Sequence, residues 1–171
     1  MSEKGRLISE TMIRFERRLP GPIERVWEYL TQPKHLAVWF GAKQSRYVLE
    51  PRVGGAVSLG DNGHIRGVVT QWQPPHKLVY TWNVFIPGET ESRYPESYVT
   101  FELTTLPEDA KQVLLTFSHR PMLEGFEQQS MMGWHSFFGL LEQLLRGEPP
   151  ESLEAAMRRN KVLYGVEEIK L

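Results

Sequence analysis

The sequence of 171 residues contains no cysteine, which excludes disulfides, thiolate nucleophiles and cysteine-based zinc sites. The net charge is −1, so the overall charge does not favour nucleic acid or an anionic membrane as a partner. No apolar run approaches the roughly 18 residues of a membrane span, and residues 1–10 lack the apolar segment of a secretory signal. We therefore expect a cytoplasmic protein without membrane insertion.

Patterns of common catalytic sites are also missing. No G-x-S-x-G elbow and no phosphate-binding loop with its lysine occurs, and no histidine pair has the H-E-x-x-H spacing of a metal site. His119 ends the apolar face of an expected strand and His135 borders a helix, so the two could meet at a pocket mouth. A buried histidine with a hydrogen-bond partner is the commoner explanation. We expect no metal ion, no cofactor and a role other than catalysis, with a cyclase or hydrolase using either histidine as an alternative.

The most regular pattern in the chain is a long amphipathic helix over 125–146. At 100° per residue, its apolar side chains fall within an arc of roughly 140°, which predicts a helix lying on a core. Ser130 falls inside this arc, and His135 lies just beyond one edge. Gly133 and Gly139 lie near the other edge, where they are expected to let neighbouring backbone come close. The apolar arc consists of Met131, Trp134, Phe137, Phe138, Leu141, Leu144 and Leu145.

The residues before this helix predict one strand, two short helices and then a series of strands. Alternating side chains predict the strands, and a proline begins one short helix while a glycine follows the other. The expected elements are a strand at 11–19, helices at 22–30 and 34–40, and strands at 44–50, 56–59, 65–73, 78–85, 97–105 and 112–119. This order predicts an α+β domain in which a curved antiparallel sheet wraps the last helix. A bent sheet around a helix tends to leave an apolar cavity between them.

The domain organisation follows from these patterns. Residues 1–10 are expected to be a flexible N-terminus, and residues 11–146 a single domain. Residues 147–171 are expected to be a C-terminal extension, helical and docked on the domain, because a weakly apolar helix follows Pro149 and Pro150. The extension could instead close a pocket mouth or contact a second subunit.

Four sequence blocks, in the right order, resemble the START-like (SRPBCC) superfamily and, within it, the family named after the activator of heat-shock protein ninety ATPase. They are P-I-E-R-V-W-E-Y-L-T-Q-P from Pro22, R-V-G-G from Arg52, the stretch from Gly67 to Trp82, and G-W from Gly133. Gln71 stands where the family usually has glutamate, which removes a carboxylate. The resemblance covers about residues 12–146. It implies a helix-grip fold, with six or seven antiparallel strands around a long C-terminal helix and two short helices after the first strand.

The resemblance implies an internal hydrophobic cavity in many relatives but no single activity. We expect non-catalytic binding of a small hydrophobic or aromatic molecule, lipid-like or polyketide-like, between the sheet and the last helix. A chaperone-associated interaction module is the alternative, and either a monomer or a homodimer is compatible with the sequence. As core residues, the same aromatics would also be buried. The candidate ligand-binding residues are Trp39, Gln71, Tyr80, Trp82, Phe101, Phe117, His119, Ser130, Trp134 and Phe138.

Overall fold

The computed structural model describes residues 11–40 and 46–170. Seven strands form one antiparallel sheet with the order β1-β7-β6-β5-β4-β3-β2. The strands are β1 (Ile13–Pro20), β2 (Val48–Leu49), β3 (Ala56–Leu59), β4 (Ile65–Gln73), β5 (Lys77–Val84), β6 (Ser97–Leu106) and β7 (Asp109–Arg120). The helices are α1 (Ile23–Thr31), α2 (Pro33–Trp39), the short 3-10 helix η1 (Asp61–Gly63), α3 (Glu127–Leu145) and α4 (Leu153–Leu163).

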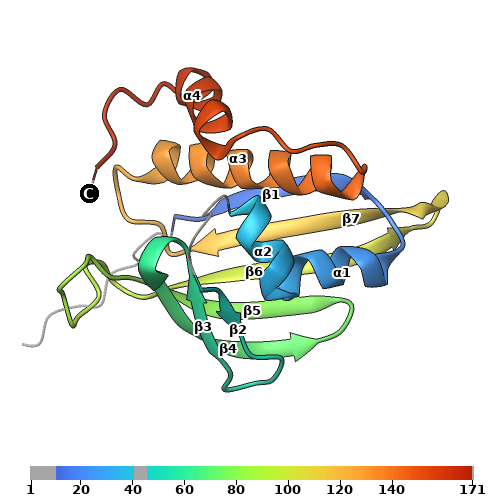
Figure 1. Ribbon diagram of the computed structural model, residues 1–171, viewed down its shortest axis with the longest axis horizontal. Coiled ribbons are helices and arrows are strands. Elements are labelled where there is room, and N and C mark those ends of the chain that lie inside the picture. The colour runs from blue at the N-terminus through green and yellow to red at the C-terminus, as the bar shows by residue number, and fades with distance from the viewer. Residues whose placement is uncertain (1–10, 41–45, 171) are drawn as a thin grey trace, which may run out of the picture.

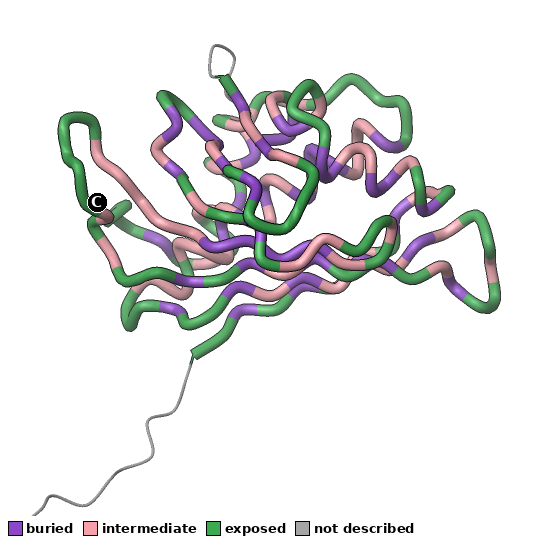
Figure 2. Tube along the Cα trace, turned by 90° about the horizontal axis from the view of Figure 1, so that it is seen from below, coloured by how far each residue is buried: buried purple, intermediate pink, exposed green. Residues whose placement is uncertain are grey.

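The curved sheet grips α3, and this arrangement confirms the expected fold class. Helices α1, α2 and α3 cover one face of the sheet, and α4 lies on the side of α3 that faces away from it (Figure 1). Along the strands, buried and exposed residues alternate, as expected for a sheet with one covered face (Figure 2). The core therefore lies between α3 and the sheet.

The bounds of two predicted strand segments differ from those in the structure. The strands of the final hairpin extend to Leu106 and resume at Asp109, so its turn is tighter than expected. The Asp109 side chain accepts a hydrogen bond from the backbone N–H of Lys111 beside this turn. The strand expected at 44–50 is limited to β2 within the described part of the chain. Its first residues, 44 and 45, lie outside the described residues, as do residues 1–10.

Helix α3 is buried on two sides, and the sequence prediction found only one of them. Met131, Phe137 and Leu144, expected in the buried arc, are only partly buried. A second buried stripe faces α4, where the Asn160 amide donates to Ser136 Oγ over 2.9 Å and Ser136 donates to the Met132 carbonyl. The fully buried residues of α3 are Met132, Trp134, Ser136, Phe138, Leu140, Leu141 and Leu145. A single-arc prediction fails here because α4 covers the flank of α3 that faces away from the sheet.

The two glycines of α3 do not allow the close backbone approach that we expected. A side-chain carbon added at Gly139 would meet no atom within 4 Å, and one at Gly133 would meet only the Met157 side chain, at 4.0 Å. The packing explanation for these glycines is therefore wrong.

The bond between Asn160 and Ser136 is expected to anchor α4. Because both side chains are buried, replacing Asn160 by alanine should lower the free energy of unfolding by about 1–2 kcal/mol. The matched control is Arg158→Ala on the exposed side of α4, which should change stability by less than about 0.5 kcal/mol. Urea denaturation of both variants measures the difference, and equal effects would mean that α4 is not held at this bond.

Candidate ligand-binding site

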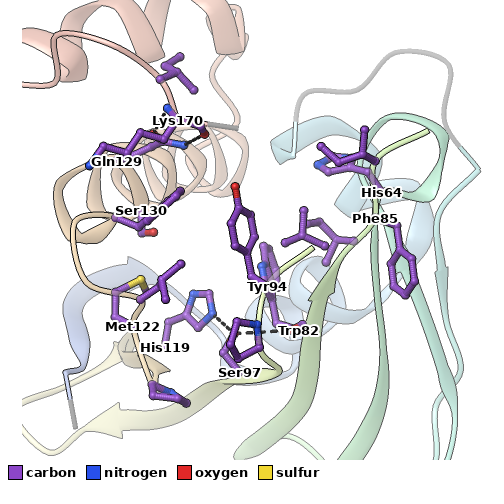
Figure 3. Close-up of a pocket in the computed structure, with 18 of the residues that line it drawn as sticks. His64, Trp82, Phe85, Tyr94, Ser97, His119, Met122, Gln129, Ser130 and Lys170 are labelled. Carbon is purple, nitrogen blue, oxygen red and sulfur yellow. Dashed lines mark hydrogen bonds between the residues drawn. The ribbon is translucent and has the colours of Figure 1, made fainter. Parts of the chain in front are cut away.

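A cavity of about 490 Å³ lies at the end of the molecule where α3 begins. Its walls come from the loop after β5, from the segment that joins β7 to α3, from η1 and from the last described residues of the chain (Figure 3). Most lining side chains are apolar, including Trp82, Phe85, Met122 and Phe126. Polar residues also line it, including the charged side chains of Asp61 and Lys170. A mainly apolar lining with polar groups at separate points is the usual composition of a small-molecule site.

The central space between α3 and the sheet is filled by aromatic rings. The Trp134 ring lies at the centre, with its centroid 4.3 Å from that of Phe117 and 5.6 Å from that of Phe138. All three side chains are almost fully buried. The free volume therefore lies beyond one end of the gripped helix, whereas the sequence led us to expect it along the helix.

Three of the ten candidate residues line this cavity: Trp82, His119 and Ser130. Gln71 lies on the opposite face of the sheet, in a depression that it shares with Tyr98, because a bulge between Val69 and Gln71 changes the register of β4. The remaining candidates are buried in the aromatic core, and they are Trp39, Tyr80, Phe101, Phe117, Trp134 and Phe138.

His119 is the buried polar residue at the floor of the cavity, and its hydrogen bonds define its tautomer. The indole N–H of Trp134 donates to Nδ1 over 3.2 Å, so Nδ1 carries no hydrogen. Nε2 lies 2.7 Å from Ser97 Oγ. Burial lowers the pKa of His119 from 6.5 to about 4, so the ring is neutral at pH 7. A neutral imidazole carries one hydrogen, and this hydrogen is therefore on Nε2 and is donated to Ser97.

This direction of donation argues against a serine nucleophile. A histidine that activates a serine must accept the serine proton at Nε2, and its Nδ1–H is usually held by an acceptor. Here Nδ1 meets a donor, and Nε2 donates. His135, the other histidine of interest, is not among the residues that line the cavity, and its Nδ1 lies 2.8 Å from the Tyr164 hydroxyl. Burial first, and then Arg17 and Arg159, lower the pKa of His135.

The sequence prediction missed several lining residues. Ser97 could have been found, because it lies two residues before Val99 on the buried face of β6. Tyr94 lies in the loop after β5, where no periodic pattern exists. Lys170 comes from the far end of the chain: its backbone N–H donates to Gln129 Oε1 over 2.7 Å, and its ammonium donates to the Gly125 carbonyl over 2.8 Å.

Within 11–40 and 46–170, no group of three or more histidine, aspartate or glutamate side chains is placed to hold a metal ion. Over the same ranges, no helix is both long enough and apolar enough to cross a membrane.

A curved antiparallel sheet around a long helix, with a cavity at the start of that helix, defines a START-like domain. Residues 20–146 match the family described as Activator of Hsp90 ATPase homolog 1-like protein, and the chain belongs to this family. No curated protein matches the sequence at a significant level.

Solved structures of other proteins share this fold. A Mesorhizobium loti protein is 26% identical, with 81% of this chain and 99% of that chain covered and a TM-score of 0.65. An HSP90 activator from Plasmodium falciparum is 22% identical, with 82% and 99% covered and a TM-score of 0.66. The Aha1 dimer from Colwellia psychrerythraea is 19% identical, with 79% and 96% covered and a TM-score of 0.61.

Proposed function

We propose that this protein binds a small hydrophobic or aromatic molecule, without catalysis, in the cavity at the start of α3. The Tyr94 hydroxyl carries this proposal. It belongs to a cavity-lining residue, it is buried, and it has no hydrogen-bond partner among the described residues. In Figure 3, Tyr94 stands between β5 and α3 with its oxygen directed toward the helix. Burying an unpaired hydroxyl costs about 1–3 kcal/mol, and a bound ligand with a polar atom would offset this cost.

The size and lining of the cavity support the same proposal. Its volume of about 490 Å³ falls within the roughly 300–1,000 Å³ of small-molecule sites. The rings of Trp82 and Phe126 offer flat apolar contact, and Ser97, His119 and Ser130 add polar groups at separate points. Such a site can hold an apolar molecule by area and orient it by a few hydrogen bonds.

Two measurements test the proposal. Native mass spectrometry of the protein purified from cells should show a retained molecule that denaturing conditions release. The uncharged fluorescent probe N-phenyl-1-naphthylamine should bind with a single site and quench tryptophan emission, because Trp82 lines the cavity. If the probe does not bind at a single site and the native mass equals that of the protein without ligand, the proposed binding function is wrong.

Replacing Tyr94 by phenylalanine is expected to separate stability from binding. Without ligand, the variant should be as stable as the parent protein or more stable by about 1 kcal/mol, because an unsatisfied hydroxyl is removed. The natural ligand retained from cells should be reduced or lost. Thermal unfolding and native mass spectrometry measure the two effects. Tyr98→Phe is the matched control, since Tyr98 lies on the opposite face of the sheet and is 42% exposed. A Tyr94 variant that is less stable and retains its ligand contradicts the proposed role of the hydroxyl.

A chaperone-associated role is the second candidate, and family membership favours it. If this chain acts as the family name suggests, it should bind the cell's Hsp90 and raise its rate of ATP hydrolysis. A purified pull-down followed by an ATPase assay tests the role, and size-exclusion chromatography with light scattering distinguishes a monomer from a homodimer. Neither binding nor stimulation at concentrations of roughly 100 μM, well above those of a typical specific complex, would exclude it.

A further inference from the structure

Three buried side chains form hydrogen bonds that all run in one direction: Trp134 in the aromatic core, and His119 and Ser97, which line the cavity. Trp134 donates to His119, and His119 in turn donates to Ser97. Trp134 has only an N–H and can never accept, so it fixes the direction of both bonds. The remaining hydrogen is that of the Ser97 hydroxyl.

The Ser97 hydroxyl hydrogen has only a weak acceptor within the protein. Among the described residues, its acceptor is the Trp82 carbonyl at 3.5 Å, beyond the usual range for an O–H donor. Ser97 lines the cavity, and in Figure 3 it lies beside His119 at the cavity floor. A ligand atom in the cavity could therefore replace the carbonyl as acceptor at little cost.

We propose that the chain from Trp134 through His119 makes Ser97 a hydrogen-bond donor to the ligand, so that the cavity selects an apolar ring system bearing a carbonyl-type acceptor. This inference rests on the proposed ligand-binding function and specifies the ligand class. Tyr94 provides a second hydroxyl without a partner in the same cavity, and His119 has no free nitrogen to accept from a ligand.

The physical setting strengthens the donor character of Ser97. A hydroxyl that accepts one hydrogen bond becomes a better donor, because the bonds polarise one another. Ser97 is 7% exposed, so water competes weakly for its hydrogen. Its strand partner Trp82 and the nearby Trp134 are uncharged rings. The charged residues that line the cavity, Asp61 and Lys170, belong to η1 and to the last described residues of the chain.

The test compares two molecules that differ at one position, fluorene and 9-fluorenone, in which a carbonyl replaces the central methylene. The parent protein should bind 9-fluorenone about tenfold more tightly than fluorene, the gain expected from one net hydrogen bond of about 1.4 kcal/mol. Quenching of tryptophan emission measures both dissociation constants. Binding of neither molecule would overturn the proposed function, whereas equally tight binding of both would overturn only the acceptor preference.

Variants separate the donor from the chain that orients it. Ser97→Cys replaces the hydroxyl by a weak thiol donor and should reduce the ratio of the two dissociation constants from about tenfold to about twofold. Trp134→Phe keeps a ring but loses the N–H, so His119 can then carry its hydrogen on Nδ1 and accept from Ser97. The preference should fall in this variant too.

His119→Gln tests whether a conservative replacement within the chain rescues its function. Its amide oxygen can accept from Trp134 and its NH₂ group can donate to Ser97, so the preference for 9-fluorenone should persist. A Ser97→Cys variant that keeps the full preference would overturn Ser97 as the donor. A folded Trp134→Phe variant that keeps it would overturn the orienting chain. Far-UV circular dichroism establishes that each variant is folded before its constants are compared.

Discussion

Replacing Trp134 by alanine is expected to lower the free energy of unfolding by about 3–5 kcal/mol. The side chain is 3% exposed and lies where α3 meets the sheet. Its ring contacts those of Phe117 on β7, Phe101 on β6 and Trp82 on β5. Removing it would leave a void that the surrounding rings can fill only in part, and His119 would lose its hydrogen-bond donor. Guanidinium denaturation followed by far-UV circular dichroism measures the loss.

The matched control is Phe137→Ala, three residues further along α3. Phe137 also contacts aromatic rings but is only partly buried, so its loss should cost clearly less, about 1–3 kcal/mol. If Trp134→Ala costs under about 1.5 kcal/mol, or no more than Phe137→Ala, the gripped helix does not depend on this ring. That outcome would mean that residues other than Trp134 contribute most to the stability of the core.

The order of the elements and their arrangement in layers could be predicted from the sequence, because both follow from local patterns of apolar and polar residues. Alternation along 97–105 and 112–119 placed Val99 and Phe117 on one face, and the structure pairs these strands with both residues buried. The two short helices were expected at 22–30 and 34–40, and the observed bounds of α1 and α2 differ from these by one residue at each end. The four sequence blocks indicated the family. These patterns depend only on residues that are close in sequence, so they predict the elements correctly however the distant segments pack.

The site could be predicted only in part, because its walls come from segments without a repeating pattern. Trp82, His119 and Ser130 were found, since each lies on the apolar side of a regular element. Tyr94 lies in an irregular loop, and Lys170 reaches the site by bonding to Gln129, 41 residues earlier in the chain. No local periodicity encodes such contacts. Gln71 was expected in the site but lies on the opposite face of the sheet. A bulge in β4 changes which face it occupies, and a strict alternation pattern cannot predict that bulge.

The same residue, Trp134, links the stability of the core to the chemistry of the cavity. Its ring fills the space that the sheet wraps, and its N–H fixes the tautomer of His119 at the cavity floor. A phenylalanine at this position could fill most of the space but could not orient the histidine. In this chain Trp134 therefore has a role beyond packing, because its N–H orients His119.

His119 is also expected to make stability depend on pH, with a loss of about 3 kcal/mol between pH 7 and pH 4. Burial is the cause that lowers its pKa to about 4 in the folded protein, against an ordinary value of 6.5. Between these values the unfolded chain binds the proton and the folded protein does not, so acid favours unfolding. The free energy of unfolding is therefore unaffected by this histidine above about pH 6.5. It falls progressively below that pH, and the loss reaches about 3 kcal/mol near pH 4.

His119→Gln isolates this effect, because glutamine can make both hydrogen bonds of the neutral histidine and cannot titrate. The pKa values of His35 and His135 are also lowered, chiefly by burial, and they add a pH dependence of the same sign to both proteins. The difference between the two proteins therefore reports His119 alone. Urea denaturation at intervals from pH 4 to pH 8 should give curves that are parallel above pH 7 and converge or cross as the pH falls. Curves that stay parallel down to pH 4 would show that His119 is protonated equally in the folded and unfolded states, and the neutral tautomer that orients Ser97 would lose its basis.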